Sequence, residues 1–397
     1  MLSRAQPTCF LIADISGYTS YLAGVEIDHA QDILADLIGT IVTALRPAFR
    51  LAKLEGDAAF TYAPADKVDG TLLLDTLERC YFGFRRRRRD VRQATSCECN
   101  ACVRIPDLNL KFAVHHGQAL HQKMAGRDEL MGSDVILVHR LLKNDVVAQL
   151  GMSAYALITQ SCVDAMGIDP VALGMPATTE SYEHIGEVRA WVHDLERRWQ
   201  EEDSRQRVRV TATEAIYSAS VPTAAPPQLA WEFVTKPGRR LGWQAGTSEI
   251  LVSNDRGGRR GVGTTNHCMH GKDAVIEDIL DWRPYDYLTE LITMGTPMGP
   301  LKYISTLEFE PTSTGTVVHF RFAPPKAARE RKIMRAMAPM VDAIFAQRGP
   351  ELTAQLDAEM ATRLAGDGEP TLPTARPDGV LASITSDGAV EDAVSRS

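Results

Sequence analysis

Apolar residues in the first half of the chain follow two spacings, which predict buried strands and amphipathic helices. Residues 8–16 form an apolar run that predicts a buried strand. Residues 48–54 and 58–63 predict two more strands, joined by the turn Glu55-Gly56-Asp57. Between the first two strands lies a predicted helix, with apolar residues at helical spacing: Ile33, Leu34, Leu37, Ile38, Ile41, Val42 and Leu45.

The alternation of helices and strands continues to about residue 195. A helix is expected around residues 68–84, and a polar, cysteine-bearing loop separates it from a strand at residues 108–115. Another helix is expected to begin at Gly132-Ser133, with Ser133 as its N-cap. A strand at Tyr155–Thr159 and a closing hairpin at Tyr182–Val192 complete this half.

The pattern of the second half predicts a different domain. An alternating strand is expected at residues 208–218, a short helix opened by prolines at 226–234, and a long helix at about 326–365. Turn signals separate six further strands: Ser248–Ser253, Gly261–Met269, Ala274–Trp282, Tyr287–Thr293, Tyr303–Glu310 and Thr316–Phe322. The domains predicted are therefore residues 1–195 and 208–365, with a charged segment at 196–207 that is a linker or an exposed helix end, and a disordered tail at 366–397.

Composition agrees with two globular domains. The chain has 397 residues, of which 44% are hydrophobic and 24% charged. A net charge of −8 argues against broad affinity for nucleic acid or anionic membranes. No apolar run approaches the roughly 20 residues that span a bilayer, and the N-terminus lacks the features of a secretory signal. We therefore expect a cytoplasmic protein whose seven cysteines are reduced or metal-bound.

Two short motifs give the first domain its candidate chemistry. Residues 10–19, FLIADISGYT, are an apolar run that ends in an acid and then a glycine. Residues 53–57, KLEGD, form a tight turn that carries a second acid. Two carboxylates at the ends of adjacent strands can hold Mg²⁺ on a nucleoside triphosphate, and a nearby glycine lets the phosphates approach the backbone. The motifs therefore indicate a phosphoryl-transfer protein.

These motifs, in this order of elements, resemble the catalytic domain of class III nucleotidyl cyclases over residues 8–195. The family's D-I-x-G-[FY]-[ST] pattern is matched by residues 14–19, and its K-x-x-G-D hairpin by residues 53–57. The resemblance implies an α+β, ferredoxin-like domain. It also implies that Asp14 and Asp57 hold Mg²⁺ or Mn²⁺ with the Ile15 carbonyl, and that the backbone from Ile15 to Gly17 lies against phosphates.

The resemblance also assigns nucleotide-binding residues. Lys53 matches the family lysine that reads adenine, and Glu129 falls at the position of its acidic partner, with Asp128 beside it. This pair favours ATP over GTP. Arg140 matches the arginine that stabilises the transition-state phosphate.

The sequence departs from the cyclase family at two places. Ile136 occupies the position of the catalytic asparagine, four residues before Arg140 on the same helix face. Residues 181–195 contain no lysine to bind the triphosphate. Losing one positioned donor commonly costs about 10²–10³ in rate, so metal binding can persist while cyclisation is weak or absent. Family sites form between two such domains, so activity would require a homodimer.

Three further features of the first half carry weaker signals. Cys97, Cys99 and Cys102 have a spacing compatible with Zn²⁺, for which Cys80, His115 or His116 would supply a fourth ligand; a reduced loop is the alternative. The run Arg85–Arg89 lacks interleaved aromatic residues and favours a solvated helix end over a nucleic-acid contact. The pair His115-His116 favours a structural role over that of a catalytic base.

The second domain resembles the START-like polyketide cyclase and lipid-transfer superfamily, a helix-grip fold with a curved antiparallel sheet and a long C-terminal helix. The segment from Pro226 to Trp231 and Trp243 after a loop are typical of it. Its members enclose an apolar cavity, so the resemblance implies a small hydrophobic ligand. The long helix would supply an adaptable, methionine-rich lining, or simply core: Ile333, Met334, Met337, Met340, Ile344 and Phe345.

Three functions follow from the two resemblances. The favoured hypothesis is a cyclase that forms cyclic AMP from ATP with two divalent metals, under the control of a hydrophobic ligand. In that reaction the ribose 3′-hydroxyl attacks the α-phosphate and releases pyrophosphate. The first alternative is a catalytically inactive sensor or scaffold that retains metal or nucleotide affinity. The second is a hydrophobic-ligand carrier, or a polyketide-cyclase-like protein, that acts through the C-terminal domain.

Overall fold

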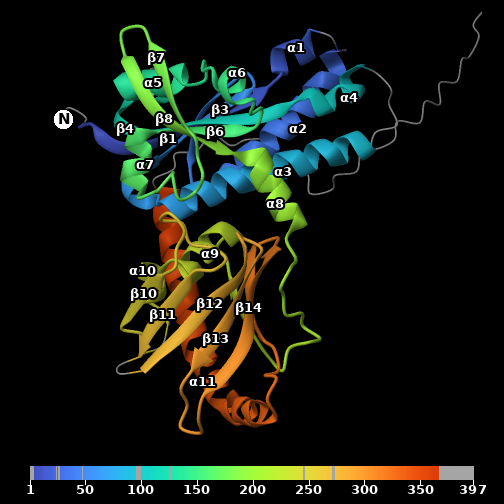
Figure 1. The fold of residues 1–397 in the computed structure, drawn as a ribbon, viewed down its shortest axis with the longest axis vertical. Helices are drawn as coiled ribbons and strands as arrows, with labels where there is room; N and C mark the ends of the chain where they lie inside the picture. The colour runs from blue at the N-terminus through green and yellow to red at the C-terminus, as the bar shows by residue number, and fades with distance from the viewer. Residues whose placement is uncertain are drawn as a thin grey trace, which may run out of the picture.

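The computed structural model describes residues 4–365, apart from residues 24, 26, 47, 95–99, 125–126, 245 and 271–272. Two domains lie one above the other, each built on its own β-sheet (Figure 1). The tail expected to be disordered lies outside the described residues. Within the described ranges, no helix combines the length and the apolar character that crossing a membrane requires.

The first domain has a mixed sheet in the order β2-β3-β1-β4-β6-β8-β7, with β5 paired to β4. Strand β1 lies inside it because its apolar side chains face both ways: Leu11 and Ala13 join one core, and Phe10 and Ile12 join the other. The strands are β1 (Gln6–Ser16), β2 (Arg50–Glu55), β3 (Ala58–Pro64), β4 (Asn109–Met124), β5 (Arg127–Met131), β6 (Tyr155–Thr159), β7 (Ala177–Tyr182) and β8 (Gly186–Asp194).

Helices cover both faces of this sheet. Residues of α2, α3 and α7 form the core on the Leu11 side, and residues of α5 and α6 pack on the Phe10 side. The helices are α1 (Tyr18–Leu22), α2 (Ile27–Leu45), α3 (Gly70–Ala94), α4 (Asn100–Val103), α5 (Ser133–Arg140), α6 (Val146–Leu150) and α7 (Gln160–Met166), with 3₁₀ turns η1 (Ala65–Lys67) and η2 (Ile105–Asp107).

The second domain has a seven-stranded antiparallel sheet in the order β10-β11-β12-β13-β14-β15-β9, with the long helix α11 packed across it (Figure 1). The helix contains Pro339 and Pro350, each of which removes a backbone hydrogen bond. The elements are β9 (Tyr217–Thr223), α9 (Pro227–Thr235), α10 (Pro237–Arg240), β10 (Glu249–Ser253), β11 (Thr265–His270), β12 (Asp273–Arg283), β13 (Tyr287–Met294), β14 (Leu301–Thr312), β15 (Gly315–Phe322) and α11 (Ala328–Ala365).

The expected α+β fold is confirmed, with a cyclase-like order of elements followed by a helix-grip domain. Two local predictions are wrong. The strand expected at 208–218 begins at Tyr217, because the backbone N–H groups of Val208 and Val210 donate to side chains instead of to a neighbouring strand. Gly132, not Ser133, is the N-cap of α5. The charged segment 196–207, expected to be a linker or an exposed helix end, is mostly helix α8 (Leu195–Ser204), capped by Asp194.

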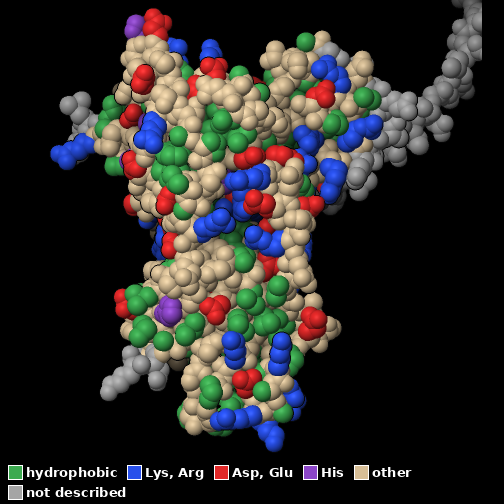
Figure 2. Space-filling view, in the orientation of Figure 1, with side chains coloured by type: hydrophobic (Ala, Val, Ile, Leu, Met, Phe, Trp, Pro, Cys, Tyr) green, Lys and Arg blue, Asp and Glu red, His purple; other side chains and the backbone are tan. Residues whose placement is uncertain are grey.

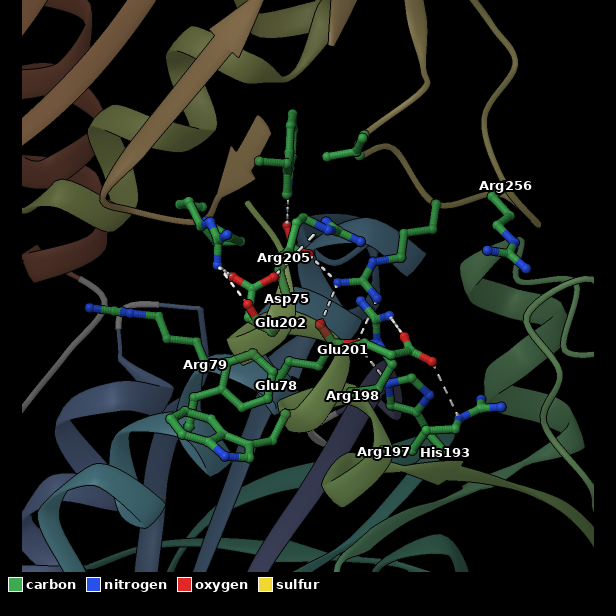
Figure 3. A pocket seen from close by; sticks show the side chains of 18 of the residues that line it. Asp75, Glu78, Arg79, His193, Arg197, Arg198, Glu201, Glu202, Arg205 and Arg256 are labelled. Atoms are coloured by element: carbon green, nitrogen blue, oxygen red, sulfur yellow. Dashed lines mark hydrogen bonds and ion pairs between the residues drawn. The ribbon is translucent and has the colours of Figure 1, made fainter. Parts of the chain in front are cut away.

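A buried ionic cluster joins the two domains. Arg259, from the loop after β10, donates to Asp75 and Glu78 on α3, with N–O distances between 2.6 and 2.8 Å. Figure 3 labels the two acids of this cluster. Trp282 of β12 also donates to Asp75, at 2.9 Å. All three charged groups are almost fully withdrawn from water, and Arg259 holds the pKa of Glu78 well below its usual range against the opposing effect of burial. The domains are therefore docked by charge as well as by shape.

A backbone contact beside this cluster requires a glycine. Gly258 has φ +77°, and a Cβ placed there would lie 1.9 Å from the carbonyl oxygen of Gly167 in the first domain. A side chain at position 258 would therefore push the loop away from the first domain.

Candidate functional site

The two predicted metal-binding acids lie at the same end of adjacent strands. Asp14 is near the end of β1 and pairs across the sheet with Ala58, the residue after Asp57. The backbone N–H of Ile15 donates to the carbonyl oxygen of Asp57, at 3.3 Å. The β2–β3 turn thus holds Asp57 against the end of β1, as the motifs imply.

The charges of the two carboxylates interact. Burial, followed by the negative charge of Asp14, raises the pKa of Asp57 to about 6. The Lys111 ammonium on β4 lies 3.2 Å from a carboxylate oxygen of Asp14 and compensates part of this charge. No sequence pattern singles out Lys111, because it reaches Asp14 only through the β1–β4 pairing.

The fit of a metal ion can be tested on these donors. The described residues contain no group of three or more His, Cys, Asp or Glu side chains arranged around a common point. The pair Asp14 and Asp57 suits a hard divalent ion whose other ligands are backbone and phosphate oxygens. The Lys111 ammonium already sits as a cation beside Asp14. The residues therefore fit Mg²⁺ or Mn²⁺ that arrives with a phosphate-bearing ligand.

Gly17 and Ile15 have structural roles beside Asp14 and Asp57. Gly17 has φ +87°, and a Cβ there would lie 2.9 Å from the carbonyl oxygen of Asp107. Ile15 is buried in the core on the Leu11 side. Both residues fix the backbone that the resemblance places against phosphates.

Lys53 pairs with a different acid from the expected one. Its ammonium lies 2.8 Å from Glu55, and Glu55 also lies 3.1 Å from His139 on α5. Burial opposes the effect, but Lys53 and His139 lower the pKa of Glu55. Glu129 lies on β5, which contacts β2, and the described residues show no ion pair between it and Lys53. An adenine-reading pair would thus require Lys53 to leave Glu55.

Arg140 is exposed in the last turn of α5. Ile136, at the asparagine position of the cyclase family, is 58% exposed on the same helix. Leu54, Leu120 and Met131, on β2, β4 and β5, are further exposed large apolar side chains of this domain.

The cysteine cluster is only partly described. Cys97 and Cys99 lie outside the described residues, while Cys102 is buried on α4. His115 is buried between Thr159, at 3.0 Å, and Asp134, at 3.3 Å, and burial lowers its pKa. This agrees with a structural histidine. A Zn²⁺ site here stays a prediction.

The second domain has an apolar cavity of about 280 Å³, partly open to solvent, between its sheet and α11. The inner faces of β12 to β15 form one wall, and the methionine-bearing turns of α11 form the other. The lining includes Val275, Ile292, Leu307, Phe320, Met334, Met337 and Ala338. The helix face identified from the sequence therefore borders a cavity over Met334, Met337, Met340, Ile344 and Phe345.

One wall of this cavity is polar. Arg240 forms a bidentate ion pair with Glu277, and both N–O distances are 2.7 Å. Asn266 donates to the same carboxylate, at 3.1 Å. Glu290 on the neighbouring strand is 3% exposed, and its Oε1 has no hydrogen-bond partner among the described residues. Burial, and then the charge of Glu277, raise the pKa of Glu290 to about 8, so its carboxyl group is protonated at neutral pH.

The sequence reasoning missed this polar wall. A signal was present in the alternation of β13, where Glu290 shares its face with the buried Leu288 and Ile292. An acid in an inward-facing position of a strand marks either a buried pair or a binding group.

Comparison with known proteins gives the family of the chain. A mycobacterial protein named "Uncharacterized protein Rv2561/Rv2562", from Mycobacterium tuberculosis (strain ATCC 25618 / H37Rv), is 35% identical over 162 residues, which are 41% of this chain and 73% of that protein. The chain belongs to the Rv2561/Rv2562 family. Residues 34–150 also match a family described as a protein of unknown function, DUF2652. Residues 214–352 match the family described as "Polyketide cyclase / dehydrase and lipid transport".

Solved structures similar to this member of the Rv2561/Rv2562 family fall into two groups. The guanylyl cyclase Cya2 is 15% identical with a TM-score of 0.36, over 48% of this chain and 93% of that chain. The adenylyl cyclase CyaB from P. aeruginosa is 13% identical with a TM-score of 0.37, over 49% and 97%. Protein MLL2253 from Mesorhizobium loti is 17% identical with a TM-score of 0.28, over 36% and 96%. These scores are low, so the description of the first domain rests on its own order of elements.

Proposed function

We propose that the C-terminal domain binds a small apolar molecule with one hydrogen-bond-accepting group, and that the protein acts as a sensor of that molecule. The observation that carries the proposal is the cavity beneath α11, with the buried carboxyl group of Glu290 facing it. A volume of about 280 Å³ lies near the lower limit for small-molecule sites, roughly 300–1,000 Å³. The match of this region to a lipid-transport family supports the same class of ligand.

The polar wall gives the ligand an orientation. The Arg240–Glu277 pair is internally satisfied and makes a poor partner for a charged ligand. Protonated Glu290 can donate one hydrogen bond to a carbonyl, ether or hydroxyl oxygen. The apolar lining then holds the rest of the molecule through burial of its surface.

The experiment uses the neutral fluorescent probe N-phenyl-1-naphthylamine with the full chain. One saturable site per chain supports the proposal. A fluorescence signal that rises without saturation, or no signal, would contradict it, since a preformed apolar cavity should take up a neutral probe of this size.

Binding of this probe is expected to depend on Glu290. As pH rises through about 8, ionisation of Glu290 places a charge in the cavity, and affinity should fall by about tenfold. The free energy of unfolding should also fall as pH rises from 4.5, the ordinary pKa of a glutamate, to about 8. In this range Glu290 keeps a proton in the folded state that it has lost in the unfolded state. Glu290→Gln should remove the pH dependence of both probe affinity and stability. Glu249→Gln, at an exposed position on β10, should leave both unchanged.

A second function is favoured by the coupled carboxylates of the first domain. We propose that Asp14 and Asp57 hold a divalent metal that brings a nucleoside triphosphate, where the metal would neutralise phosphate charge. Arg140, from a partner domain in a homodimer, would meet the same phosphates. The exposed apolar side chain of Ile136, on the same helix as Arg140, supports such a dimer. Because the asparagine position holds Ile136, we expect nucleotide binding with slow or absent formation of cyclic AMP.

Asp57→Asn is expected to have two effects of opposite sign. Without metal, the raised pKa of Asp57 lowers the free energy of unfolding of the wild type as pH rises from about 4 to about 6. Above pH 6 the variant should therefore be more stable than the wild type, by about 1 kcal/mol once solvent screening is included. With Mn²⁺ and ATP, the wild type should gain thermal stability, and the variant should lose most of that gain.

Differential scanning fluorimetry measures both effects. Asp66→Asn, a change of an exposed acid in η1, is the matched control and should behave as wild type. Equal stabilisation of wild type and Asp57→Asn by Mn²⁺ and ATP would place the nucleotide elsewhere. Rapid cyclic AMP formation in the same mixture would favour the fully active cyclase of the original hypothesis.

A further inference from the structure

A second, larger cavity lies between the two domains and has a volume of about 640 Å³. Helices α3 and α8 and the segment after α8 form one side, and the loops at residues 256–262 and 282–286 form the other. Figure 2 shows lysine and arginine side chains gathered at this waist of the molecule. The cavity is distinct from both sites described above.

Positive charge is concentrated in this cavity. Ten arginines line it against six carboxylates, although the whole chain has a net charge of −8. Much of the charge is compensated in place: Arg259 pairs with Asp75 and Glu78, and Arg283 pairs with Glu202. Four more lining arginines also have acidic partners: Arg197, Arg198, Arg205 and Arg260.

Three arginines account for much of the excess. Among the described residues, no carboxylate lies within ion-pair distance of Arg79, Arg86 or Arg207. Asp286 is a nearby acid whose charge acts on Arg79 and Arg86, but it forms an ion pair with neither. Burial, together with the positive charge of Arg207, lowers the pKa of Arg86. Like charges are therefore held close together with too little negative charge between them.

Two of these guanidinium groups are oriented by aromatic rings. Arg79 lies over the ring of Tyr285, at 4.3 Å from its centroid, and Arg86 lies over Trp199, at 5.7 Å. A guanidinium stacked on a ring keeps its N–H donors in its own plane, where they remain available to an acceptor. The neutral amide oxygen of Gln228 can accept from Arg79, at 2.6 Å, and leaves its charge uncompensated.

We propose that the cavity between the domains binds a small phosphate-bearing anion through Arg79, Arg86 and Arg207. Guanidinium groups bind phosphate with paired, charge-assisted hydrogen bonds, and the anion would relieve the repulsion between these side chains. Because Arg79 and Arg86 belong to α3 and Arg207 belongs to the segment that leads to the second domain, the anion would hold the two domains together.

The test is isothermal titration of the full chain with inorganic pyrophosphate, in EDTA and at low salt. EDTA removes the divalent metal that anion binding at Asp14 and Asp57 would need. We expect one saturable site, and Arg86→Gln and Arg207→Gln should each weaken it about tenfold, the effect of one lost charge-assisted contact. Neither side chain lies in the hydrophobic core and neither has an ion-pair partner among the described residues, so the variants should fold; unchanged melting temperatures without pyrophosphate check this.

Two control variants separate the proposal from its alternatives. Arg92→Gln, at an exposed position on the same helix α3, is the matched control and should bind as wild type, whereas Arg140→Gln, on α5, reports any binding at the phosphate site proposed in the first domain. Absence of a saturable site would overturn the proposal. Equal weakening by Arg92→Gln would indicate general attraction to positive charge, and weakening by Arg140→Gln alone would place the anion in the cyclase-like domain; either result would also overturn it.

Discussion

Replacing Arg259 by alanine is expected to lower the free energy of unfolding by about 3–5 kcal/mol, because it leaves buried carboxylates without their partner. The Asp75 carboxylate would keep only its hydrogen bond from the Trp282 indole, and the Glu78 carboxylate would keep its contacts with His193 and Arg198. All of these groups lie at the domain boundary, so the second domain should separate from α3 before either domain unfolds.

Urea unfolding and small-angle scattering measure these two consequences. The scattering radius of Arg259→Ala should exceed that of wild type at urea concentrations where both domains keep their secondary structure. Arg256→Ala is the matched control, since Arg256 is exposed in the same loop and has no ion pair among the described residues. A loss below about 1 kcal/mol, the size expected for an exposed pair, would show that this cluster does not hold the domains together.

Ala338→Trp is expected to reduce binding of the naphthylamine probe by at least about a hundredfold, since an indole would fill most of the cavity. Ala338 is half-buried on α11 and lines the cavity. The larger side chain fills the space that the ligand would occupy. The free energy of unfolding should therefore change less than the affinity for the probe.

Ala336→Trp makes the same chemical change two residues earlier on α11, at an exposed position outside the cavity lining. It should bind the probe as wild type does. If both variants bind equally well, the probe does not enter the cavity. If both bind poorly, the change acts through the helix and not through the filled space.

Local patterns in the sequence were sufficient for most of the fold. The strand Tyr155–Thr159 has the predicted bounds, and the later strands agree with prediction to within a few residues. The pair Asp14 and Asp57 was predictable because both motifs lie at strand ends that the β-hairpin brings together. Helix α3 runs ten residues past its predicted end at residue 84, because Arg87 pairs with Asp36 on α2 and Arg88 donates to the Leu108 carbonyl.

The functional contacts that the sequence did not predict are long-range. Arg259 and Glu78 are 181 positions apart in the chain, and no periodicity connects them. Lys53 matches the family lysine, yet Glu55, two residues away, is its partner in the structure. The alternation of β13 indicates that Glu290 faces inward, but its neighbours Glu277 and Arg240 are known only from the fold. Pattern and motif locate elements, whereas the pairing of charges depends on how those elements pack.

Hydrogen–deuterium exchange of the full chain, with and without N-phenyl-1-naphthylamine, shows whether the C-terminal cavity is the ligand site. We expect the probe to slow exchange in α11 from Met334 to Leu352 and in the facing strands β13 and β14, with little change in β1 to β8. Protection centred on the first domain, or none at a saturating probe concentration, would contradict it.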